Sequence, residues 1–129
     1  MKPKILIILA DYYKEISVEM LDSTINHIDK KSKFNLIRVP GVFEIPVVIS
    51  KNIKKYDGFI ALGCVIKGET PHFDFISQTT TNAIMQLSID HKKPVGNGII
   101  TALNKDQASN RSIKKGEEAA AAVFSVLSK

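Results

Sequence analysis

Residues 5–10 read ILIILA, and residues 59–66 read FIALGCVI. Both runs have the length of a strand, and neither alternates apolar with polar residues. An unbroken apolar run of this length is typical of a parallel strand that is buried on both faces. We therefore expect these two segments to lie inside a parallel sheet that is covered by helices on both sides.

The rest of the chain continues the alternation of strand and helix. Two further β-rich segments predict strands over 34–39 and 94–101. The spacing of apolar residues predicts helices over 16–28, 44–55, 72–91, 105–111 and 116–127. Repeated alternation with short connections predicts the α/β class, as a flavodoxin-like three-layer sandwich with a four-stranded parallel sheet. We expect residues 1–129 to form one domain.

The charged residues argue against binding to nucleic acid. The chain carries 18 basic and 13 acidic side chains, a net charge of +5. Nucleic-acid binding needs basic residues gathered on one face. Here the lysines fall in pairs at the ends of the expected elements, where they complement helix dipoles. The same charge suits a small phosphorylated ligand, so we expect small-molecule substrates and no nucleic-acid partner.

Length and cysteine content exclude several other classes of protein. A chain of 129 residues can fold around a core without covalent cross-links. Its apolar runs fall short of the roughly 20 residues that span a bilayer, and Asp11 ends the first run too early for a secretion signal. The single cysteine, Cys64, excludes an internal disulfide, and its place in an apolar run indicates a buried, inert thiol. We expect a cytoplasmic protein with no membrane partner.

Polar and aromatic residues gather where the expected strands end. The segments 11–13, 40–46 and 63–74 follow or close the first three strands. Parallel sheets bind ligands beyond the carboxyl ends of their strands, so we expect these three segments to converge on one site. Tyr12 either stacks on a planar ligand there or covers the edge of the sheet.

The segment that follows the third strand holds the largest group of candidate residues. Gly68, Glu69 and Thr70 precede a helix start, where free backbone N–H groups favour an anion. Lys67 adds a positive charge, and His72 can transfer protons near neutral pH. Alternatively, Thr70 only caps the helix and His72 is a surface residue of its first turn.

Other chemistry finds little support in the sequence. His27 and His91 lie near expected helix C-termini, beside lysines or acidic residues, and we expect them to be solvated. The His, Cys, Asp and Glu residues lack a spacing typical of metal ligands. The serines and histidines lack the pattern of a nucleophile elbow. We therefore expect neither a metal site nor a hydrolase triad.

The segments at the strand ends resemble the signature sequences of the lumazine synthase family. Residues 40–46 (PGVFEIP) and 63–74 (GCVIKGETPHFD) are closely similar to its two signature segments. Residues 94–101 resemble the fourth strand of the family, and residues 106–111 and 115–120 resemble its closing segments. The likeness extends from about residue 5 to residue 127, with the motifs in order.

The resemblance implies a transferase of the penultimate step of riboflavin biosynthesis. Such enzymes condense 5-amino-6-(D-ribitylamino)uracil with 3,4-dihydroxy-2-butanone 4-phosphate and release phosphate and water. They form 6,7-dimethyl-8-ribityllumazine without a metal or a cofactor. The reaction needs proton transfer and anion binding more than it needs a nucleophile.

The resemblance also implies roles for individual residues. It makes His72 the catalytic, proton-transferring residue and Tyr12 the ring on which the pyrimidine stacks. The residues implied for the pyrimidine and ribityl groups are Tyr12, Val42, Phe43, Glu44, Val65, Ile66, Lys67, Asn97, Lys115 and Glu118. The residues implied for the phosphate are Gly68, Glu69, Thr70 and Arg111. A neighbouring subunit is expected to supply Asn97, Arg111, Lys115 and Glu118.

Several positions depart from the usual pattern of the family. Tyr12 stands where Phe or Trp is more usual, and Asn97 stands where some relatives have Phe. Tyr13 and Lys14 replace the Asn and Asp of many relatives. These changes leave the chemistry intact and bear on substrate affinity. Because we expect a short loop over 111–115 and a chain that begins almost at its first strand, the resemblance implies an open homopentamer rather than a capsid.

Alternative functions make different demands on the sequence. A relative of the archaeal riboflavin synthases would share the fold, but its pocket motifs differ from residues 68–74. A non-catalytic flavin-binding or shell protein could keep the pocket. A receiver domain would need clustered acidic residues after the first strand, where Asp11 stands alone. A flavodoxin would copurify with a bound flavin.

Overall fold

Two strands with side chains buried on both faces form the centre of the molecule. The computed structural model describes residues 2–68 and 73–129. In it, β1 (Lys4–Ala10) and β3 (Gly58–Ile66) pair in parallel, with Ile5 opposite Gly58 and Leu9 opposite Leu62. Every residue of β3 is buried, as is every residue of β1 after Lys4. The two unbroken apolar runs therefore form the central strands, as expected.

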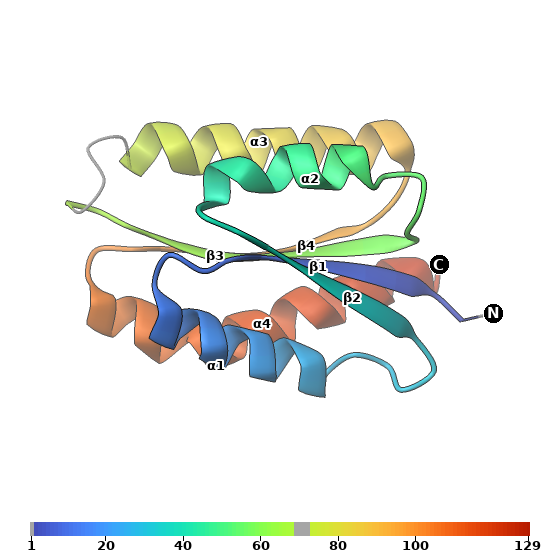
Figure 1. Ribbon diagram of the computed structural model, residues 1–129, viewed down its shortest axis with the longest axis horizontal. Helices are drawn as coiled ribbons and strands as arrows, with labels where there is room; N and C mark the ends of the chain where they lie inside the picture. The colour runs from blue at the N-terminus through green and yellow to red at the C-terminus, as the bar shows by residue number, and fades with distance from the viewer. Residues whose placement is uncertain (1, 69–72) are drawn as a thin grey trace.

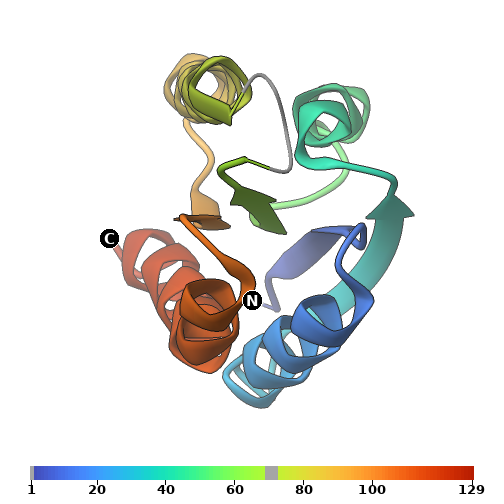
Figure 2. The same cartoon turned by 90° about the vertical axis from the view of Figure 1, so that its left-hand side faces the viewer.

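Two further strands and four helices complete a three-layer sandwich. β2 (Lys33–Val39) pairs with β1 and β4 (Val95–Ala102) pairs with β3, so the parallel sheet has the order β2-β1-β3-β4. One face is covered by α1 (Lys14–Asn26) and α4 (Lys105–Leu127), and the other by α2 (Ile45–Lys51) and α3 (Phe73–His91) (Figure 1, Figure 2). This order confirms the predicted flavodoxin-like fold.

The alternation of side chains along the strands divides the apolar interior into two cores. Leu9 and Leu62 point into the core shared with α1 and α4. Ile8 and Ala61 point into the core shared with α2 and α3. Among the described residues, no helix combines the length and the apolar character needed to cross a membrane.

The helix predicted over 44–55 is shorter in the structure. A short 3-10 turn, η1 (Val42–Glu44), leads into α2, which carries Pro46 in its first turn and ends at Lys51. Asn52 ends the helix because its side-chain amide donates to the carbonyl of Val48 at 2.8 Å. Turns then lead to β3.

The prediction of two closing helices is wrong, because α4 runs without interruption from Lys105 to Leu127. Residues 112–115 contain neither glycine nor proline, so the helix passes through them. Gly116 is buried at the contact with α1, where a Cβ would lie 2.6 Å from the carbonyl oxygen of Met20. Residues 111–115 are therefore helix rather than a short loop, and loop length gives no support to the open pentamer.

The close approach of β4 to α4 generates a prediction about stability. A Cβ on Gly96 would collide with the carbonyl oxygen of Ala119. We expect Gly96→Ala to lower the free energy of unfolding by about 1–3 kcal/mol, because α4 must shift away from the sheet. Urea denaturation at a fixed protein concentration measures the change.

Gly41→Ala is the matched control for this variant. Gly41 has an ordinary extended backbone (φ −150°), and a Cβ there would meet only the flexible end of Glu44, at 3.3 Å. We expect this substitution to change the free energy of unfolding by less than about 0.5 kcal/mol. Equal stability of Gly96→Ala and the unsubstituted protein would contradict the close packing.

Candidate functional site

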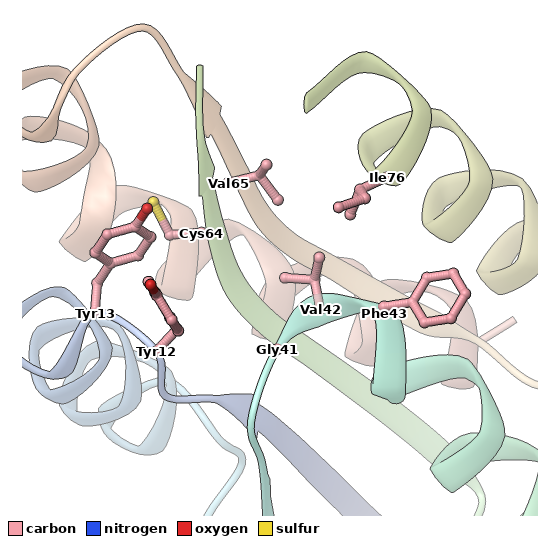
Figure 3. Close-up of a pocket in the computed structure, with 8 residues that line it drawn as sticks. All are labelled: Tyr12, Tyr13, Gly41, Val42, Phe43, Cys64, Val65 and Ile76. Atoms are coloured by element: carbon pink, nitrogen blue, oxygen red, sulfur yellow. The ribbon is translucent and has the colours of Figure 1, made fainter. Parts of the chain in front are cut away.

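A cavity of about 240 Å³ lies over the carboxyl ends of β1 and β3 (Figure 3). Its walls come from the connection between β1 and α1, from the segment around η1, from the end of β3 and from α3. The lining residues are Tyr12, Tyr13, Gly41, Val42, Phe43, Cys64, Val65 and Ile76. The position is the one predicted for ligands of parallel sheets, and the aromatic and apolar lining suits a planar ring.

Two tyrosines form one wall of the cavity. Tyr12 is 73% exposed and Tyr13 is partly buried, and their rings meet edge to face with centroids 4.9 Å apart. The buried hydroxyl of Ser17 lies 2.9 Å from the carbonyl oxygen of Tyr13 and 3.3 Å from that of Ala10. Ser17 therefore ties the turn that presents both tyrosines to the first turn of α1.

The η1 turn forms the facing wall. Val42 is buried, whereas the ring of Phe43 is 58% exposed at the mouth (Figure 3). The turn can lie directly on β3 because residue 63 is glycine, where a Cβ would come within 2.6 Å of Val42 Cγ1. Glu44 is partly buried and lies outside the cavity lining.

The end of β3 contributes side chains from both faces of the sheet. Cys64 belongs to the core shared with α1 and α4, and Val65 to the core shared with α2 and α3. Ile66 is buried and Lys67 is exposed, and the Lys67 N–H donates to the Ala102 carbonyl at 2.9 Å.

The predicted anion-binding segment begins at Gly68. Gly68 has φ +90°, a conformation that glycine adopts without strain. Glu69, Thr70 and His72 lie outside the described residues, so their predicted roles remain predictions. Among residues 2–68 and 73–129, no three His, Cys, Asp or Glu side chains are grouped so that they could hold a metal ion.

The remaining predicted site residues form a second, separate group. Asn97 is exposed on β4, which is an edge strand, and Lys115 and Glu118 lie on α4. Arg111 is exposed on α4, and its Nη1 donates to the Thr101 carbonyl at 3.2 Å. Among the described residues that line the cavity, none comes from β4 or α4. Within one chain, the predicted residues therefore divide between two places.

Four lining residues were missing from the predicted site: Tyr13, Gly41, Cys64 and Ile76. The sequence marks Tyr13 only as a departure from the usual pattern of the family. Cys64 is buried as predicted, yet it borders the cavity, because the cavity lies across the end of β3. Ile76 lies on α3 four residues after His72, and its helical spacing could have indicated this position.

Comparison with known proteins identifies the family. The sequence profile of the 6,7-dimethyl-8-ribityllumazine synthases matches residues 2–129. The chain is 39% identical over 115 residues to the 6,7-dimethyl-8-ribityllumazine synthase of Bartonella tribocorum, covering 86% of this chain and 76% of the relative. It is 40% identical over 121 residues to that of Bartonella bacilliformis, covering 90% of this chain and 79% of the relative.

A more distant organism gives the same result. The chain is 38% identical over 128 residues to the 6,7-dimethyl-8-ribityllumazine synthase of Nitratidesulfovibrio vulgaris, covering 91% of this chain and 82% of the relative. The chain therefore belongs to the 6,7-dimethyl-8-ribityllumazine synthase family, the transferases of riboflavin biosynthesis.

Proposed function

We propose that this protein condenses 5-amino-6-(D-ribitylamino)uracil with 3,4-dihydroxy-2-butanone 4-phosphate in the cavity over β1 and β3. The observation that carries the proposal is the aromatic and apolar cavity at the carboxyl edge of the sheet. We further propose that the protein works in the cytoplasm, where the thiol of a single cysteine such as Cys64 stays reduced.

The walls of the cavity suggest how the pyrimidine would bind. Its planar ring would lie against Tyr12, whose exposed face is available for stacking. The apolar side chains of Val42 and Val65 would exclude water from the ring. Glu44 would accept hydrogen bonds from the ribityl hydroxyls beside the cavity, because an ionised carboxylate is an acceptor only.

The phosphorylated substrate would bind next to the pyrimidine. Backbone N–H groups of residues 68–70, which precede α3, would hold its phosphate. His72 would then transfer protons between the two substrates during imine formation and loss of phosphate. The chain needs no nucleophile in this scheme, because the amine of the pyrimidine attacks the carbonyl carbon of the second substrate.

We propose that each site is completed by a second copy of the chain. The separation of Asn97, Arg111, Lys115 and Glu118 from the cavity supports this arrangement. A second observation supports an oligomer: α3 exposes apolar side chains on the surface, with Phe75 64%, Met85 59% and Ile89 61% exposed. A closed ring, as in the homopentamer implied by the family resemblance, would give every subunit the same neighbour.

The reaction itself is the first test. We expect the purified protein to form fluorescent 6,7-dimethyl-8-ribityllumazine from the two substrates. His72→Ala should lower kcat by about 10²–10⁴-fold, once the rate of the uncatalysed reaction has been subtracted from both measurements. His91→Ala is the matched control, because His91 lies exposed at the far end of α3. An unchanged kcat in His72→Ala would remove His72 from the mechanism. Conversion of the lumazine to riboflavin instead would indicate a riboflavin synthase.

Arg111 is expected to bind the phosphate group. Arg111→Ala should raise the KM for the butanone phosphate by about 10–150-fold, because a charge-assisted hydrogen bond is lost. Inorganic phosphate should inhibit the unsubstituted protein and inhibit this variant much less. Lys114→Ala, which removes a neighbouring exposed charge from α4, serves as the control. Equal inhibition of the unsubstituted protein and of Arg111→Ala by phosphate would count against a role of Arg111 in phosphate binding.

Mixing two impaired variants tests the shared site. His72→Ala and Arg111→Ala are co-expressed in equal amounts and purified as mixed oligomers with two tags. In a closed ring, a site is intact when the subunit that supplies His72 and the neighbour that supplies Arg111 each carry the unsubstituted residue. Each condition holds for about half of the subunits, so about a quarter of the activity should return. Each variant alone is the control. Recovery near zero in proven mixed oligomers would place both residues in a site within one chain.

A further inference from the structure

We propose that Tyr13 is a positioning residue, which fixes the orientation of the Tyr12 ring and thereby the way the pyrimidine stacks. The proposal rests on the function proposed above, since it takes Tyr12 as the stacking surface. It concerns a residue at which the chain departs from the usual pattern of the family.

Tyr12 needs a support because of its exposure. With 73% of its surface exposed, the side chain has few neighbours that restrict its rotation. A ring that moves freely loses rotamer freedom when a ligand stacks on it, and this loss weakens binding. The Tyr13 ring lies 4.9 Å away, at an angle of 81° between the ring planes. This is a favourable edge-to-face arrangement, so Tyr13 restricts Tyr12 from the side.

Tyr13 is itself held by several parts of the structure. Its ring packs against the apolar core between the sheet and helices α1 and α4. Its carbonyl oxygen accepts from the backbone N–H and from the hydroxyl of Ser17, each at 2.9 Å. The Nζ atom of Lys105, at the start of α4, lies 5.9 Å from the centroid of the ring. A packed ring therefore supports an exposed one.

Tyr13 also closes one side of the cavity. Its ring extends from the start of α1 toward Cys64 on β3 (Figure 3). Tyr13 also lines a second groove, together with Lys14, Lys105 and Ser109. The residue therefore borders both the cavity and this groove. Loss of the ring would free Tyr12 and would let water enter beside the pyrimidine.

Steady-state kinetics test the proposal through the two Michaelis constants. Tyr13→Leu should raise the KM for the pyrimidine by about two- to tenfold, the range for loss of an aromatic contact. The KM for the butanone phosphate and the kcat should stay within about twofold of their values in the unsubstituted protein. Tyr13→Phe retains the ring and should retain the pyrimidine KM. Tyr13→Met is a second variant that lacks the ring, and it replaces Tyr13→Leu in the test if Tyr13→Leu does not fold.

Tyr56→Phe is the matched control, since Tyr56 lies before β3 at the opposite end of the sheet, where its hydroxyl donates to Asn35. An unchanged pyrimidine KM in both variants without the ring would overturn the proposal. Equal changes in both Michaelis constants would indicate general damage to the site and would overturn it as well.

Circular dichroism in the near ultraviolet tests the same claim without activity. The chain has no tryptophan and three tyrosines, so the tyrosine signal comes from Tyr12, Tyr13 and Tyr56 alone. We expect the spectral changes of Tyr12→Leu and Tyr13→Leu to be non-additive in the double variant, because Tyr13 orients Tyr12. Additive changes would overturn the proposal. A protein that forms no lumazine but shows this coupling would refute the proposed function and leave the role of Tyr13 intact.

Discussion

The burial of β1 and β3 on both faces is the constraint on which the rest of the structure depends. A strand covered by helices on both sides cannot carry polar side chains along its length, because each would need a buried partner. Polar groups are therefore confined to the points where the two strands end. In this protein the carboxyl ends of β1 and β3 provide Tyr12, Tyr13, Cys64 and Val65, and the cavity forms between them.

The same constraint bears on the proposal that a second copy of the chain completes the site. The sheet ends at β4, and α4 lies on the face opposite α2 and α3 (Figure 2). Asn97 on β4 and Glu118 on α4 are exposed and do not line the cavity of their own chain. In the proposed ring, the contact between one copy and the next would be of the heterologous kind, in which two different surfaces meet. On β4, such a contact would meet the exposed residues Asn97 and Thr101.

The sequence predicts the strands well and the helix boundaries less well. A strand buried on both faces leaves an unbroken apolar run, which is a local signal, so β1 and β3 could be found without a structure. The sequence predicts a helix start at Gly116, but the residue lies inside α4. Glycine is needed there because of the close contact with α1, which is not visible in the local sequence. Cys64 was expected in a core, and it lies in one, yet the cavity crosses the end of its strand. The contact between Tyr12 and Tyr13 depends on the conformation of the turn, which the residue types alone do not determine.

The packing of α1 against α4 has a consequence for the order in which the chain can fold during synthesis. Thr24 donates to the carbonyl of Gly116, and Ser23 to that of Ile113, so the second element of the chain is covered by the last. β1 likewise acquires its partner β3 only after residue 66 has been made. On the ribosome, residues 5–10, an apolar segment of the kind prone to aggregation, therefore lack their β3 partner until residue 66 has been made. Lys2 and Lys4, next to this segment, keep it charged during that interval.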